Sequence, residues 1–288
     1  MPFHHPGDEA ISVTTAVGMP KKAADARRDP RVSLLFSDAT GSGIHDPSMV
    51  LVQGIATVDD ADLDLNRARY ERDSAAKPTG PTEQAPSGTA FDWYYARLYI
   101  DVRPMRVYVW RKGDLGAEPD VHELDEADTE AAQGLPAPPP RPPGRPPHWN
   151  RRLEHLGRRH DTAVLSFVET DGHPFAIRVP VDADRRAKVV RIDAEPHGVR
   201  LLPGPACLTA HDHHEQLHWT RNFQVRGELL QDRDGWLVTP QRVLSGFELP
   251  PSGAVTRAVL NLGKIRRFRQ TAKRERERRA SGPGRPSG

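Results

Sequence analysis

Apolar residues recur along most of the chain in runs and alternations of strand length, which predicts a protein built mainly of β-strands. Such segments lie at 11–17, 31–36, 49–60, 97–110, 205–212 and 222–234. The strongest hairpin signal is at 161–181, where an apolar run, an Asp-Gly turn and alternating apolar residues follow one another. At 255–272 apolar residues recur every three or four positions, which predicts an amphipathic helix near the C-terminus.

Two segments of low complexity interrupt these patterns. Residues 135–148 read LPAPPPRPPGRPPH, and proline, which lacks an amide donor, excludes this run from a sheet. Together with the acidic stretch before it, the run predicts a linker at 113–147. The segment Ser74 to Ala90 is expected to be a surface loop. We therefore predict a first domain at 1–112 and a second at 148–270. A proline-rich ligand for a partner's aromatic groove is a less favoured interpretation of the linker.

The net charge of +2 hides an uneven distribution along the 288 residues. Residues 264–288 hold ten basic and two acidic side chains, so the remainder of the chain carries a net charge of −6. A basic tail on an acidic body could bind nucleic acid. The apolar periodicity favours instead a helix packed on the body, followed by a disordered basic tail at 271–288.

Composition indicates the cellular compartment in which the protein is expected. No run of about 18 apolar residues is present, so we expect no membrane-spanning helix. The N-terminal sequence lacks the basic and apolar regions of a secretory signal. The single cysteine, Cys207, cannot form an internal disulfide. A cytoplasmic protein is therefore expected.

The two halves share a pattern that indicates an internal duplication. In each half an apolar strand ending in Asp precedes a polar loop and a second strand that contains Gly. The offset is 174 residues between Asp38 and Asp212, and 173 between Gly54 and Gly227. A glycine inside a strand suggests a bulge or bend. The repeat therefore predicts two related β-units.

The second half opens with the hairpin at 161–181, whereas the first half is already in a strand by residue 11. A barrel that lacks two strands exposes unpaired backbone, which proteins avoid. The first barrel is thus expected to be shortened, either because the chain start is placed too late or because another element or subunit completes it.

Residues 11–36 form the most specific stretch, with a strand, a turn, a short helix opened by Pro20, an Asp-Pro stop and an apolar strand. This order resembles the split-barrel flavoproteins of the pyridoxamine 5'-phosphate oxidase family. The matching residues are Thr15, Lys22, Arg27, Arg28, Asp29, Pro30 and Val32. The strands at 49–60 and 97–110, and those of the second half, fit the same family. The resemblance implies a mainly β fold of two tandem split β-barrels, antiparallel and Greek-key-like, with short helices.

The resemblance also implies a cofactor, FMN or a related deazaflavin, and an oxidoreductase that transfers hydride to or from a small organic substrate. Hydroxyls at a strand end, lysines and the amides of a helix start can hold a phosphate. The expected cofactor-binding residues are Thr14, Thr15, Lys21, Lys22 and His45. Pro20 stands where family members commonly have Ser, which removes one hydroxyl. No side chain is assigned a catalytic role, since the flavin performs the chemistry.

The run HDHHEQLH at 211–218 is the densest group of potential metal ligands. The repeat places it in a loop, and no companion pair gives a familiar metal spacing. A solvated loop is favoured, and no metal ligand is assigned.

Three functional classes stay open. The leading hypothesis is a flavin-dependent oxidoreductase acting as a homodimer or as an internal pseudo-dimer of its two barrels. The alternatives are a non-catalytic protein that binds or sequesters the cofactor, and nucleic-acid binding through the basic tail, which we do not expect. A membrane partner is not expected.

Overall fold

The computed structural model describes residues 2–3, 9–40, 42, 44–75, 92–124, 135, 146–192, 195–214, 220–245 and 254–280. Most of the predicted loop at 74–90 and most of the proline-rich run at 135–148 lie outside these ranges. None of the helices within them combines the length and apolar character that crossing a membrane requires.

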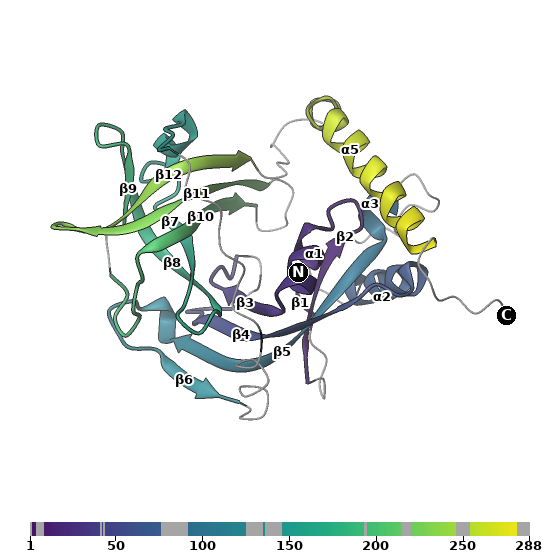
Figure 1. Ribbon diagram of the computed structural model, residues 1–288, viewed down its shortest axis with the longest axis horizontal. Helices are drawn as coiled ribbons and strands as arrows, with labels where there is room; N and C mark the ends of the chain where they lie inside the picture. Colours follow the sequence, from purple (N-terminus) through teal and green to yellow (C-terminus); the bar gives the residue numbers. More distant parts are fainter. Residues whose placement is uncertain are drawn as a thin grey trace. The chain divides into compact units, whose positions relative to one another are not determined.

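The fold is mainly β, as predicted, with a closed six-stranded barrel, an open six-stranded sheet that corresponds to half a barrel, short helices and a long C-terminal helix (Figure 1). The barrel strands are β7 (Thr162–Val168), β8 (Pro174–Asp184), β9 (Val189–Ile192), β10 (Gly204–His213), β11 (Thr220–Asp232) and β12 (Gly235–Ser245). Their order around the barrel is β10-β11-β12-β9-β8-β7.

The open sheet is built by the first half of the chain. Its strands are β1 (Pro2–Phe3), β2 (Ile11–Ala16), β3 (Arg31–Phe36), β4 (Met49–Asp59), β5 (Arg97–Trp110) and β6 (Asp120–Glu123). The order is β1-β2-β5-β4-β3, and β6 pairs with β5. Part of the segment expected to be a linker at 113–147 is therefore a sheet strand. The helices are α1 (Lys21–Arg28), α2 (Leu63–Ala75), α3 (Asp92–Tyr95) and α5 (Ala254–Ala280), with 3-10 turns η2 (Arg111–Gly113) and η3 (Arg151–His155).

The chain forms two compact units that are not its consecutive halves. One unit holds Met1–Pro30, Ile55–Arg103 and Ser252–Gly288, and the other holds Arg31–Gly54 and Pro104–Pro251. Strands β4 and β5 each run from one unit into the other. The predicted domains, 1–112 and 148–270, thus differ from the units, because parts of the first half pack with the barrel.

The barrel core explains why parts of the first half belong to the barrel unit. Side chains on alternate positions of β7 point inward, so Ala163, Leu165 and Phe167 are buried while their neighbours are half-exposed. Met49, Leu51 and Trp110, all from the first half, belong to the same buried cluster. Burying these side chains removes apolar surface from water. The ends of β4 and β5 that carry them therefore stabilise the barrel unit, although neither strand belongs to the closed barrel.

Two local predictions in the barrel are confirmed. Strand β7 pairs with β8 in register from Thr162↔Pro180 to Val168↔Pro174, which closes the expected hairpin. Gly172 in its turn has φ 87°, a conformation that favours glycine. The pairing of β11 with β12 shifts register between Arg226 and Gly227, which is the bulge that the glycine suggested.

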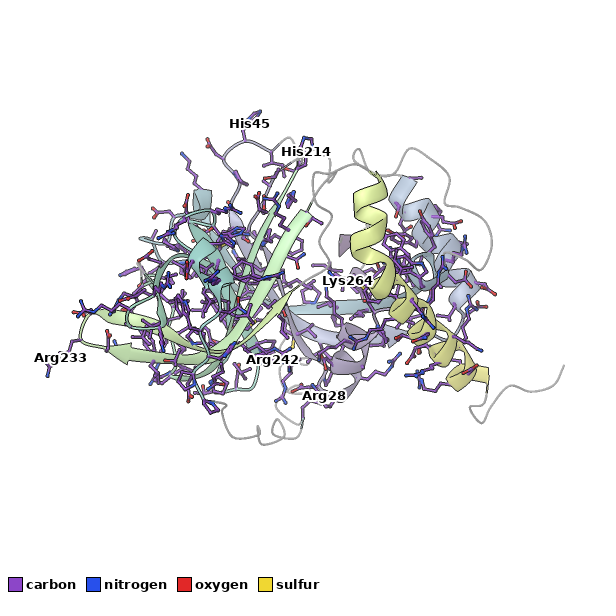
Figure 2. All side chains as sticks on the ribbon, turned by 90° about the horizontal axis from the view of Figure 1, so that it is seen from above. Arg28, His45, His214, Arg233, Arg242 and Lys264 are labelled. Carbon is purple, nitrogen blue, oxygen red and sulfur yellow. The ribbon has the colours of Figure 1, made fainter. Side chains whose placement is uncertain are left out.

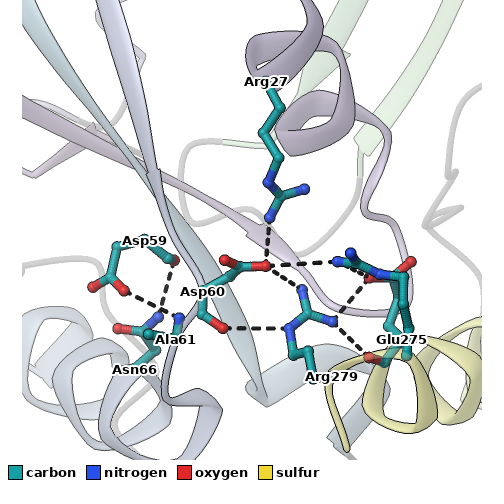
Figure 3. Close-up of polar contacts among 8 residues, drawn as sticks. Arg27, Asp59, Asp60, Ala61, Asn66, Glu275 and Arg279 are labelled. Atoms are coloured by element: carbon teal, nitrogen blue, oxygen red, sulfur yellow. Dashed lines mark hydrogen bonds and ion pairs between the residues drawn. The ribbon is translucent and has the colours of Figure 1, made fainter. Parts of the chain in front are cut away.

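The C-terminal helix α5 is packed, as favoured, but in the unit of β2 and not with the second barrel. Phe268 stacks on Trp93 with ring centroids 5.5 Å apart, and Ala272 is buried. The helix continues to Ala280, past residue 271 where disorder was expected, because its basic residues meet acidic partners (Figure 3). Arg279 Nη2 lies 2.6 Å from Asp60 Oδ2. Residues 281–288 lie outside the described ranges.

Candidate functional site

The strand–turn–helix segment expected to hold the cofactor is present, as β2, a turn and α1. The turn is fixed by the backbone, since Gly18 N donates to Trp93 O at 3.0 Å. A Cβ atom on Gly18 would lie 2.7 Å from that same carbonyl oxygen. No side chain larger than hydrogen therefore fits at Gly18 without moving α3.

Helix α1 begins without a side-chain cap. Its N-cap residue is Pro20, no side chain accepts a hydrogen bond from the first turn, and that turn contains no acidic residue. Lys22 is exposed on the first turn. Lys21 is exposed as well, and its Nζ lies 2.5 Å from Asp25 Oδ2 one turn later. A helix start with amides free of side-chain caps and with two lysines is electrostatically suited to an anion.

The two threonines differ in what they can offer. Thr15 is buried and donates its hydroxyl proton to the Met19 carbonyl at 2.7 Å, so this proton closes the turn and is not available to a phosphate. Thr14 is half-buried and lies opposite Tyr99 in the pairing of β2 with β5. His45 is exposed in the connection between β3 and β4, in the unit of the barrel (Figure 2).

A second cluster, which we call the Asp38 cluster, consists of Asp38, His211 and His213 in the unit of the barrel. His211 and His213 are two residues apart on β10 and share one face, with ring centroids 6.1 Å apart and planes within 4°. Asp38 Oδ2 lies 3.2 Å from His211 Nε2 and 3.3 Å from His213 Nε2. The loop interpretation of 211–218 was wrong for 211–213, and the strand predicted at 205–212 is confirmed, because β10 pairs with β11 as far as His213↔Thr220. Residues 215–219, including His218, lie outside the described ranges.

Neighbouring groups set the charge of the Asp38 cluster. Burial opposes ionisation of Asp38, but hydrogen bonds from the side chain and backbone of Thr40, with the two histidines, lower its pKa to about 2. The pKa of His211 is lowered, chiefly by burial and then by the Arg178 guanidinium. Arg178 Nη2 lies 2.8 Å from His211 Nε2, and its other nitrogens contact Ser37 and Thr162. The cluster therefore joins an ionised carboxylate to a neutral His211.

A third polar group ties β4 and β5 to the β7–β8 hairpin. Gln53 is 1% exposed, and its Nε2 donates to Glu169 Oε2 at 2.6 Å and to the Pro174 carbonyl at 3.2 Å. Arg106 Nη1 donates to Gln53 Oε1 at 3.3 Å. Burial raises the pKa of Glu169, against the hydrogen bond from Gln53. Since every group in it has a protein partner, this network is suited to holding the hairpin.

The buried His173 beside this network gives a pH-dependent prediction. Burial lowers the pKa of His173, although Asp171 Oδ2 lies 3.4 Å from its Nδ1. The unfolded chain, with a histidine pKa of about 6.5, then binds the proton before the folded chain does. The free energy of unfolding should fall between about pH 7.5 and pH 5.5, and less steeply in His173→Gln. Urea unfolding at both pH values measures this, with exposed His197→Gln as control; an equal pH dependence in wild type and His173→Gln would contradict it.

Sequence reasoning missed the Asp38 cluster but held a signal for it. The predicted repeat makes Asp38 and Asp212 equivalent positions, and the structure brings Asp38 to His211, which is the neighbour of Asp212. The alternation His-Asp-His at 211–213 is also the pattern of a strand with both histidines on one face.

No family model matches the sequence, and neither the curated proteins nor the solved structures contain a significant match.

Proposed function

We propose that this protein binds a flavin, FMN or a related deazaflavin, and acts as an oxidoreductase on a small organic substrate. The observation that carries the proposal is the start of α1, which follows the fixed turn after β2 and has no side-chain cap, no first-turn acid and an exposed Lys22. The segment lies in a mainly β fold with a closed barrel and a half-barrel sheet, which is the architecture that the flavoprotein resemblance implies.

The residues present fit a phosphate in part. The amides of 21–23 and the Lys22 ammonium group would hold its oxygens, and Thr14 would lie at the strand end. Lys21 shares its charge with Asp25, and Thr15 keeps the turn closed. A bound flavin would supply the hydride chemistry, and the protein would orient it and exclude water.

Lys22→Ala should weaken FMN binding by about 10- to 150-fold, because one charge-assisted hydrogen bond to phosphate contributes about 1.5–3 kcal/mol. The measurement is quenching of FMN fluorescence on titration with protein, repeated by absorbance with a deazaflavin. Lys273→Ala, which removes an exposed lysine from α5, is the matched control. Equal affinities for wild type and Lys22→Ala would show that the phosphate is not held at α1.

A non-catalytic cofactor-binding protein is the second candidate. It is favoured by the loss of two hydroxyl donors at the turn, since Thr15 is engaged with Met19 and Pro20 has none. Reduction of bound flavin by a nicotinamide or other organic hydride donor separates the candidates. Tight binding with no reduction by any donor tested would favour the non-catalytic protein.

We further propose that the two halves act as an internal pseudo-dimer. The support is the barrel core, which already incorporates Met49, Leu51 and Trp110 of the first half. Light scattering of the purified chain distinguishes this arrangement, which needs only one copy, from a homodimer.

A further inference from the structure

We propose that the Asp38 cluster binds a divalent transition-metal ion through Asp38 Oδ2, His211 Nε2 and His213 Nε2. The three groups come from the end of β3 and the end of β10, and their ligand atoms lie within 4.8 Å of one another. This inference concerns a different set of residues from the flavin proposal and does not depend on it.

The distances from Asp38 to the two histidines match ligand-to-ligand distances in a metal coordination shell. Zinc bonds to histidine nitrogen and carboxylate oxygen are about 2.0–2.2 Å long, so two ligands of a tetrahedral ion lie about 3.3–3.5 Å apart. Asp38 Oδ2 is 3.2 Å from His211 Nε2 and 3.3 Å from His213 Nε2. Two of the three ligand pairs thus have the spacing that a bound ion would impose, and the third pair, the two histidine nitrogens, lies within 4.8 Å.

Outer contacts orient two of the ligands. His213 Nδ1 lies 3.1 Å from the carbonyl oxygen of His214, at the end of β10. A carbonyl only accepts, so Nδ1 carries the hydrogen, and in the neutral ring the lone pair is on Nε2, which faces Asp38. The Thr40 amide donates to Asp38 Oδ1 at 3.0 Å, which leaves Oδ2 toward the histidines. Ligating histidines and carboxylates in metal sites are held by outer contacts of this kind.

A cation would relieve a repulsion at His213. In the neutral His213 ring the Nε2 lone pair faces the Asp38 carboxylate oxygen, which is repulsive unless a proton or a metal ion bridges them. Arg178 donates to His211 Nε2, the atom that a metal would bind, at 2.8 Å. Metal binding would replace that one hydrogen bond, while the contacts of Arg178 to Ser37 and Thr162 can persist.

The chemistry of the ligand set defines the ion. Two imidazoles and one carboxylate suit Zn²⁺, Co²⁺, Ni²⁺ or Fe²⁺ better than Ca²⁺ or Mg²⁺, which prefer oxygen ligands. The side chains of Asp38, His211 and His213 are 30%, 26% and 17% exposed, so solvent reaches the cluster. With three protein ligands, a water molecule or another small ligand would complete the coordination.

The test is titration of the full-length, chelator-treated protein at about pH 7.5 with Zn²⁺ by calorimetry and with Co²⁺ by visible absorption. We expect one ion per chain and the d–d bands of a four- or five-coordinate Co²⁺ site. Asp38→Asn and His213→Ala should each weaken binding about 100-fold, since even outer-contact mutations in metal sites cost about 10- to 100-fold. His197→Ala, which removes an exposed histidine outside the cluster, should leave binding unchanged.

Arg178→Met provides a second test, in which Zn²⁺ affinity should rise instead of fall. Removing the competing guanidinium should tighten Zn²⁺ binding about tenfold, because a tenfold change needs only about 1.4 kcal/mol. Absence of stoichiometric binding would identify the Asp38 cluster as an ion pair bridged by protons and overturn the proposal. Binding that survives both Asp38→Asn and His213→Ala would overturn it as well, by placing the ion on other histidines. Circular dichroism of each variant checks that the barrel is folded.

Discussion

Replacing Trp110 by alanine is expected to lower the free energy of unfolding by about 3–5 kcal/mol, the usual loss for a large aromatic side chain in a core. Trp110 is 1% exposed and lies at the end of β5 in the buried cluster of the barrel unit. Its ring meets Phe175 of β8 edge-on, with centroids 6.3 Å apart, and stacks on Tyr108 at 6.0 Å. Alanine would leave a cavity between the first half of the chain and the barrel.

Chemical denaturation monitored by far-ultraviolet circular dichroism measures this loss. Trp110→Phe is the matched control, because it keeps an aromatic ring at the site. The indole Nε1 has no hydrogen-bond partner among the described residues, so phenylalanine forfeits no bond there and should cost less than about 1.5 kcal/mol. A loss below about 1 kcal/mol in Trp110→Ala would contradict the placement of Trp110 in the barrel core.

Gly227→Ala is expected to destabilise the protein by about 3 kcal/mol through steric overlap in the closed barrel. A Cβ atom at this position would lie 2.2 Å from the carbonyl oxygen of Thr239 and 2.9 Å from Val238 Cγ1. The oxygen belongs to the backbone of β12, which pairs with β11 on both sides of the bulge. The overlap can therefore be relieved only by shifting one strand against the other.

Gly263→Ala makes the same chemical change in α5, where a new Cβ would meet nothing within 4 Å. It should stabilise by up to about 1 kcal/mol, because glycine is a poor helix former. The two variants should thus shift the midpoint of thermal unfolding in opposite directions. A midpoint for Gly227→Ala equal to that of wild type would show that β12 does not approach β11 this closely.

Much of the barrel was predictable because its signals are local. The Asp-Gly turn inside 161–181 specified a hairpin, and the glycine of the repeat marked the bulge at Gly227. The strand–turn–helix at 11–36 also followed from residue order. The division of β4 and β5 between the two units was not predictable. The apolar pattern around Met49 and Leu51 indicates that these side chains are buried, but it does not indicate which core they join.

In the candidate sites, too, local features were predictable and contacts between distant residues were not. Residue type and order indicated Lys22 at the start of α1, but whether Thr15 offers its proton depends on the conformation of the turn, which only the structure shows. Asp38 and His211 are 173 positions apart, so no local pattern could pair them. Among the sequence patterns, only the predicted repeat, which relates Asp38 to Asp212, connected residues so far apart in the chain.

The most direct test of the flavin proposal compares FMN with riboflavin on the unmodified protein. The two ligands share the ring system and differ by the phosphate that the start of α1 is proposed to hold. We predict that FMN binds at least about tenfold more tightly than riboflavin by fluorescence quenching, and that about 0.5 M salt narrows this difference, since salt screens exposed charges. No binding of FMN or deazaflavin at tens of micromolar, or equal affinity for FMN and riboflavin, would contradict the account.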